Sequence, residues 1–115
     1  MKFNNAWYKT FLTGIERDYK KTDLFFSVAN SLSINIWEFL ENYDHWELFD
    51  AEVTMEDAID SIYASIQESD EEINEIIEHL RSYELQDWGE IDGDIEILVT
   101  GLNLMKSLRK EMNRE

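Results

Sequence analysis

The sequence predicts an all-α fold, a compact bundle of about five or six short helices. Apolar residues recur at spacings of three and four along most of the chain, which is the period of a helix with one buried face. The 115 residues include no Pro and only four Gly, so we expect long elements and short connections. With 43% hydrophobic and 13% aromatic residues, residues 1–115 can bury a core and are expected to form a single domain.

A first helix is predicted after Asn4 or Asn5, either of which can cap its N-terminus. Its apolar residues share a spacing of three and four, as on one face of a helix: Trp7, Tyr8, Phe11, Leu12, Ile15 and Tyr19. Thr22 or Asp23 is predicted to cap a second helix. The inward residues of this second helix are Leu24, Phe25, Val28 and Leu32.

Residues 31–33 are predicted to form a turn, after which Ser33 caps a third helix. The apolar residues of the third helix are Ile36, Trp37, Phe39, Leu40 and Tyr43, with Trp46 as a further candidate. Residues 32–36 also alternate as a strand does, but the later apolar positions keep the helical period and favour a helix.

Residues 28–39 resemble a helix-turn-helix, in which the second helix reads DNA. That second helix would carry Glu38, Glu41 and Asp44 with no Lys or Arg, and would repel phosphates. DNA binding by this segment is therefore not expected.

Residues 48–53 are predicted to link this part of the chain to two acidic helices. Thr54 followed by Asp57 resembles a capping box, and Ser69 followed by Glu72 is a fuller one, so we expect a helix to start at each place. The inward residues are Ala58, Ile59, Ile62, Tyr63 and Ile66 in the first of these helices, and Ile73, Ile76, Ile77, Leu80 and Tyr83 in the second.

A loop is predicted at residues 86–94. The last helix follows, and its apolar residues are Ile95, Leu98, Leu102, Met105, Leu108 and Met112. The Asp92–Gly93 pair and the alternation of apolar residues after it also fit a β-hairpin near residues 88–99. An α+β fold with this small hairpin therefore stays open as an alternative.

Charge is distributed unevenly along the chain. Residues 38–96 contain 21 acidic residues and one cation, Arg81, which gives a local charge of −20 against −16 for the whole chain. Such an excess repels DNA, RNA and anionic membranes, so we expect a basic protein partner, no direct nucleic acid and no membrane. Because the chain has no Cys and no apolar run of about 18 residues, we expect a cytoplasmic location.

The spacing of the titratable residues predicts no catalytic, metal or cofactor site, and we expect a protein that is not an enzyme. Neither His45 nor His79 has the Glu three residues before it that a di-iron bundle motif requires. An EF-hand register around the Asp-Gly-Asp segment fails because Trp88 and Val99 would occupy ligand positions.

The acidic residues of the middle of the chain form the candidate partner-binding site. They fall outside the apolar stripes, and Glu71 and Glu75 stand four apart, where a surface built for solubility would place opposite charges. The predicted partner-binding residues are Glu56, Asp57, Asp60, Glu71, Glu72, Glu75, Glu78, Asp87, Glu90 and Asp92. Trp46 and Trp88 are candidate apolar anchors, with core packing as the alternative for each.

In size, charge and helicity the chain resembles the small acidic DNA-mimic and anti-defence proteins of phages and mobile elements, including anti-CRISPR proteins. The resemblance implies a non-enzymatic inhibitor that presents carboxylates to a basic, nucleic-acid-handling protein. Helix-borne acids reach about one charge per 4 Å along residues 38–96, against one phosphate per roughly 3.4 Å of a DNA strand.

Two other interpretations stay open. One is an immunity protein or antitoxin that neutralises a basic toxin such as a nuclease. The other is a structural or scaffold protein, with a homodimer formed through the last helix, whose apolar residues include Leu98, Gly101, Leu102, Met105 and Leu108.

Overall fold

The computed structural model describes residues 5–42, 54–82 and 91–113, and these residues form five helices and no strand. The helices are α1 (Ala6–Glu16), α2 (Lys21–Asn42), α3 (Met55–Glu68), α4 (Asp70–Ser82) and α5 (Ile91–Met112). The predicted all-α bundle is confirmed, and the number of helices falls within the expected range. Two of the helices are longer than expected, at 22 residues each.

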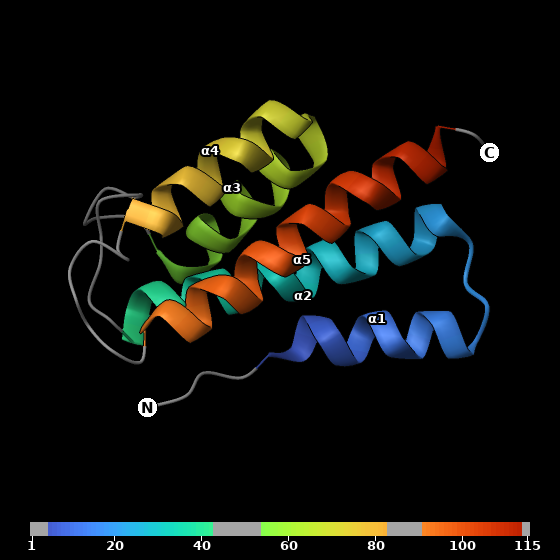
Figure 1. Cartoon of the computed structure of the whole chain (residues 1–115), viewed down its shortest axis with the longest axis horizontal. Coiled ribbons are helices and arrows are strands. Elements are labelled where there is room, and N and C mark those ends of the chain that lie inside the picture. Colours follow the sequence, from blue (N-terminus) through green and yellow to red (C-terminus); the bar gives the residue numbers. More distant parts are fainter. Residues whose placement is uncertain (1–4, 43–53, 83–90, 114–115) are drawn as a thin grey trace.

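The two long helices, α2 and α5, lie side by side through the middle of the molecule (Figure 1). Helix α1 packs against α2 on one side, and α3 and α4 form an antiparallel helical hairpin on the other (Figure 1). Within this hairpin α3 contacts α2, and α4 contacts α5. The molecule therefore has α1 and the α3–α4 hairpin at opposite edges of a central helix pair.

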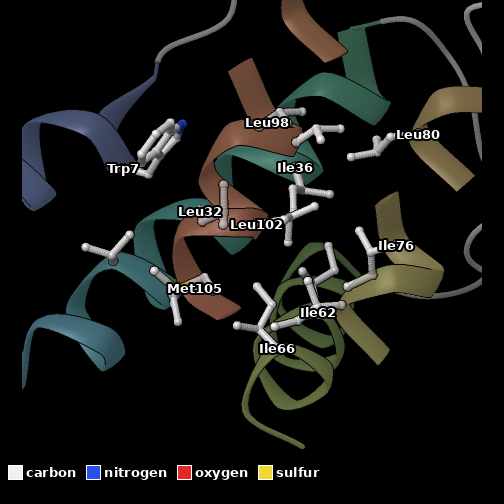
Figure 2. Close-up of a cluster of buried hydrophobic side chains, with 14 of the residues drawn as sticks. Trp7, Leu32, Ile36, Ile62, Ile66, Ile76, Leu80, Leu98, Leu102 and Met105 are labelled. Atoms are coloured by element: carbon white, nitrogen blue, oxygen red, sulfur yellow. The ribbon is translucent and has the colours of Figure 1, made fainter. Parts of the chain in front are cut away.

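The core lies where the hairpin meets the central pair. Figure 2 shows side chains of α2, α5 and the hairpin converging on one cluster. Its labelled members from these helices are Leu32, Ile36, Ile62, Ile66, Ile76, Leu80, Leu98, Leu102 and Met105, all buried. These are the positions that the apolar spacing assigned to the inner faces of the helices, and that part of the prediction is confirmed.

The turn predicted at residues 31–33 is wrong, because α2 runs through it without a break. The Ser33 hydroxyl donates to the carbonyl oxygen of Ala29 at 2.7 Å, and the Ser31 hydroxyl shares a hydrogen bond of 3.0 Å with that of Thr10. Both serines thus satisfy their polar groups without ending the helix. The helix-turn-helix resemblance fails with the turn, and α2 begins at Lys21, just before the predicted caps.

The predicted start of the last helix is also wrong. Helix α5 begins at Ile91 and includes Gly93, so the predicted loop extends too far and the β-hairpin alternative is wrong. Ile97 is partly exposed whereas Ile95 and Val99 are buried, which is the pattern of a helix with one face inward. Acidic residues in the first turn of a helix interact favourably with its dipole, which favours a helix over a hairpin here.

The cap of α1 comes from another helix. Asn5 stands at the N-cap position, but its side chain makes no capping hydrogen bond. Instead, the backbone N–H of Trp7 donates to Oδ1 of the buried Asn35 in α2, at 3.0 Å. Asn35 therefore supplies from a distance the acceptor that a local cap would provide, and it ties the start of α1 to α2.

The apolar face predicted for the first helix is only partly buried. Trp7 is buried and Phe11 partly so, whereas Tyr8, Leu12 and Ile15 are exposed. Helix α1 packs chiefly against α2, and this one main neighbour covers only part of its apolar circumference.

Candidate protein-binding surface

The acidic hairpin is positioned by two side-chain caps that the sequence predicted. The Thr54 hydroxyl accepts from the backbone N–H of Asp57, and the Ser69 hydroxyl accepts from that of Glu72, both at 3.2 Å. Ser69 has an extended backbone, with φ −165° and ψ 163°, and is the single residue between α3 and α4. The chain reverses direction at Ser69, which caps the start of α4, so the two acidic helices lie against each other.

Apolar residues form the inner face of the hairpin, and the carboxylates lie on its outer face. The buried residues of the two helices are Ala58, Ile62, Ile66, Ile73, Ile76 and Leu80. Of the predicted site residues on the hairpin, six are exposed: Glu56, Asp57, Asp60, Glu71, Glu75 and Glu78. The seventh, Glu72, is half-buried. The sequence therefore placed these seven residues correctly relative to the core.

Helix α4 carries the most regular part of this surface. Glu71, Glu75 and Glu78 recur at spacings of four and three, so they lie along one stripe opposite the buried isoleucines. At a rise of about 1.5 Å per residue, neighbouring carboxylates on the stripe are separated by roughly 6 and 4.5 Å along the helix axis. The stripe is a row of like charges.

The carboxylates are close enough to affect one another's protonation. The pKa of Glu72 is raised, first by the negative charge of Glu75, then by partial burial, and then by Glu68 and Glu71. Glu68 was missed by the sequence analysis although it stands four residues before Glu72. Ser69 breaks the helix between them, so the helical spacing of four does not apply, but Glu68 is still near enough to raise the pKa of Glu72.

Cations near the hairpin contact residues other than the predicted carboxylates, and Lys106 of α5 donates to Oδ1 of Asn74 on α4 at 2.8 Å. Arg81 forms an ion pair of 2.7 Å with Glu96 of α5. Arg109 of α5 lies 3.5 Å from Asp70, donates to the carbonyl oxygen of Ile66, and places its guanidinium 5.5 Å from the ring centre of Phe25. These contacts fasten the hairpin to the central helices, and neither of the two ion pairs uses any of the seven predicted carboxylates.

Several predicted residues cannot be added to this surface. Asp87 and Glu90 lie outside the described residues, as do the candidate anchors Trp46 and Trp88. Asp92 lies in the first turn of α5 rather than in a loop.

Two findings concern other functions. The part of the chain that the structure describes contains no group of three or more His, Cys, Asp or Glu side chains placed to hold a metal ion. In the same residues, no helix is both long enough and apolar enough to cross a membrane.

The chain was compared with protein-family models, with curated proteins and with solved structures, and none of the three comparisons found a match.

Proposed function

We propose that this protein is a non-enzymatic inhibitor that binds a basic, nucleic-acid-handling protein through the acidic surface of its α3–α4 hairpin. The observation that carries the proposal is the set of seven outward carboxylates, six of them exposed, from which the nearby cations Arg81 and Arg109 are diverted into other pairs.

The electrostatics of the hairpin support a binding role. Like charges four residues apart on a helix destabilise it slightly, and Glu71–Glu75 and Glu56–Asp60 both have this spacing. A partner with a basic groove would relieve the repulsion, and the attraction would speed association. A surface that only keeps a protein in solution would mix both signs of charge.

The arrangement of the carboxylates supports nucleic-acid mimicry as the mode of binding. The acids of α4 repeat at roughly 5 Å along a rigid rod, somewhat wider than the roughly 3.4 Å between phosphates of one DNA strand. A groove lined with Lys and Arg would accept such a row in place of phosphates, and nucleic acid would then compete for the same groove.

The proposal is tested by capture from a lysate of the cells that make the protein. The immobilised protein is expected to retain a basic protein at about 0.1 M salt and to release it near 1 M, where the screening length falls to about 3 Å. Duplex DNA or structured RNA added at low salt should displace the captured protein. A partner that is retained at 1 M salt and is not displaced by DNA or RNA would contradict nucleic-acid mimicry. Such a result would favour an interface that neutralises a toxin.

A charge-matched pair of variants locates the surface. Asp60→Asn, Glu71→Gln and Glu75→Gln together should weaken capture and flatten its salt dependence. The control, Asp23→Asn with Glu41→Gln and Glu111→Gln, removes the same charge at exposed positions of α2 and α5. Equal losses of binding in the two variants would mean that overall charge, and not the hairpin, attracts the partner.

A further inference from the structure

Helix α1 exposes an apolar stripe that nothing in the described residues covers. Tyr8, Leu12 and Ile15 are 52%, 46% and 50% exposed, and their spacing of four and three aligns them on one face of the helix. Ile97 of α5, at 37% exposed, is near the Tyr8 end of this stripe, where both residues line a common hollow. An apolar patch that involves two helices is larger than the single exposed residues that are normal on a surface.

The hollow beside Tyr8 has a volume of about 310 Å³ and is lined by Asn5, Trp7, Tyr8, Ile97 and Thr100. Two buried polar atoms of its lining residues, Nε1 of Trp7 and Oδ1 of Asn5, find no hydrogen-bond partner in the described part of the chain. Buried donors and acceptors are nearly always satisfied in native proteins. The hollow is thus an apolar recess at the Tyr8 end of the stripe, with two unsatisfied polar atoms among its lining residues.

The charge around α1 differs from that of the acidic α3–α4 hairpin. Between residues 5 and 21, Lys9, Arg17, Lys20 and Lys21 outnumber Glu16 and Asp18, which gives a net charge of +2. Residues 54–82 contain nine acids and one Arg, a net charge of −8. A second copy of this strongly acidic chain therefore meets less repulsion if it approaches at α1 than if it approaches at the hairpin.

The charges that flank the stripe are self-complementary. Lys9 and Glu16 are seven residues apart, or two helical turns, and therefore border the stripe on the same side. If two α1 helices pair antiparallel about a two-fold axis near Leu12, the same flank of each helix meets the other. Lys9 lies three residues before Leu12 and Glu16 lies four after it, so Lys9 of one copy and Glu16 of the other differ in height by only about 1.5 Å.

We propose that two copies of this chain associate through α1, with the stripe of Tyr8, Leu12 and Ile15 of one copy packed antiparallel on that of the other. The interface is isologous, because each contact occurs twice by symmetry. Leu12 meets Leu12 at the axis, and Tyr8 lies opposite Ile15 of the second copy. A uniformly acidic or basic partner fits this surface less well, because it would leave either Glu16 or Lys9 beside a like charge.

This interface differs from the one suggested by the sequence, which used the last helix. Leu98, Leu102, Met105 and Leu108 are buried in the core of a single copy and are unavailable to another. The proposal is also independent of the proposed function, since α1 and the hairpin lie at opposite edges (Figure 1) and both acidic surfaces stay open in the pair.

Engineered cysteines test the contact directly, because the chain has no Cys of its own. Helices packed 8–10 Å apart bring facing Cα atoms within about 4–6 Å, which is the range of a disulfide. Under mild oxidation Leu12→Cys should form a disulfide-linked dimer at least ten-fold faster than Ser61→Cys, an exposed position on α3. Equal rates would overturn the proposal.

A mixture of Tyr8→Cys and Ile15→Cys chains tests the orientation. The antiparallel arrangement should give mainly mixed dimers, which differ from both homodimers in mass. If each variant instead cross-links with its own kind, the antiparallel interface is wrong.

A charge exchange tests whether the flanks recognise each other. Sedimentation of the unmodified chain up to about 1 mM should show a concentration-dependent monomer–dimer equilibrium, because an interface built on an 11-residue helix is small. Lys9→Glu alone or Glu16→Lys alone should weaken association by about ten-fold, since each creates two like-charge contacts. The double variant should recover it. A chain that stays monomeric throughout, or a double variant no better than the single ones, would overturn the proposal.

Discussion

Helix α1 and the α3–α4 hairpin share an amphipathic sequence pattern but differ in how much of their apolar surface is buried. Both have apolar residues at helical spacing, and both pack on the central pair of α2 and α5. The hairpin buries its isoleucines and turns its carboxylates outward. Helix α1 buries Trp7 but leaves three large apolar side chains in contact with solvent. Amphipathic spacing thus shows that a helix has an apolar face, and it does not show which molecule covers that face.

The difference follows from the number of neighbours. Each helix of the hairpin packs against the other and against one of the long helices, so two surfaces share the burial of its apolar residues. Helix α1 has one principal neighbour and a mixed charge around its exposed stripe. Its free face is therefore the less acidic of the two surfaces and the better one for close contact between copies.

The largest effect expected from this comparison is on stability. Ile66→Ala should lower the free energy of unfolding by about 2–5 kcal/mol, because Ile66 is fully buried and truncation leaves a cavity. Leu12→Ala should change it by less than about 0.5 kcal/mol, because Leu12 is half exposed. Denaturant unfolding measured at low protein concentration, where association of copies contributes nothing, tests both values. Similar losses in the two variants would mean that the stripe of α1 is buried within one copy.

The next largest effect is expected on stability, from a change at the contact between Gly14 of α1 and Leu24 of α2. A Cβ at Gly14 would overlap the side chain of the fully buried Leu24, so Gly14→Ala should destabilise the fold by about 1–2 kcal/mol after allowing for the better helix propensity of Ala. Gly93→Ala is the matched control, since its Cβ would meet nothing within 4 Å, and it should stabilise by up to about 1 kcal/mol. Thermal unfolding of both variants checks the two signs, and a neutral Gly14→Ala would show that α1 is held loosely.

The sequence was most informative where local signals and burial agreed. The inner faces of α2–α5 followed from apolar spacing, and the hydroxyls of Thr54 and Ser69 cap helices as predicted. It misled where the hydrogen bond of a side chain is satisfied elsewhere: Ser33 bonds within its own helix and Asn35 caps a different one. The bond from Trp7 to Asn35 joins residues 28 apart in the sequence, so it has no local pattern.

For the candidate site, the sequence predicted that the acidic side chains are exposed, but it did not predict which of them lie close together. Every predicted acid on the hairpin points away from the core, as spacing alone implied. The influence of Glu68 on Glu72 depends on the reversal of the chain at Ser69, which the capping signal located without giving its geometry. The exposed stripe on α1 was unpredictable for a similar reason, since the number of helices that would cover α1 depends on the packing of the whole chain.

A smaller change in stability is expected from a substitution just after the C-terminus of α1. Asp18 has a positive φ of 54°, and the Tyr19 N–H donates to the carbonyl oxygen of Gly14 at 2.9 Å, as in a Schellman cap. Gly adopts this left-handed conformation without strain, so Asp18→Gly should stabilise the chain by about 0.5 kcal/mol after its greater flexibility when unfolded is counted. Chemical denaturation measures the change. Asp23→Gly, at an exposed position inside α2, is the control and should destabilise instead.

The smallest expected effect is that of removing one carboxylate from the hairpin, which measures the repulsion between its like charges. Because Glu75 is the main cause of the raised pKa of Glu72, Glu75→Gln should lower that pKa toward its ordinary value of 4.5. A raised pKa means that the folded chain binds more protons than the unfolded chain just above pH 4.5, so stability falls as the pH rises through this window. The variant should flatten this fall and, by removing the Glu71–Glu75 pair, gain a few tenths of a kcal/mol near neutral pH. An NMR titration of the Glu72 side-chain carboxyl, with Glu78→Gln as a control that leaves its pKa unchanged, decides whether the carboxylates of α4 act on one another as the proposed binding surface requires.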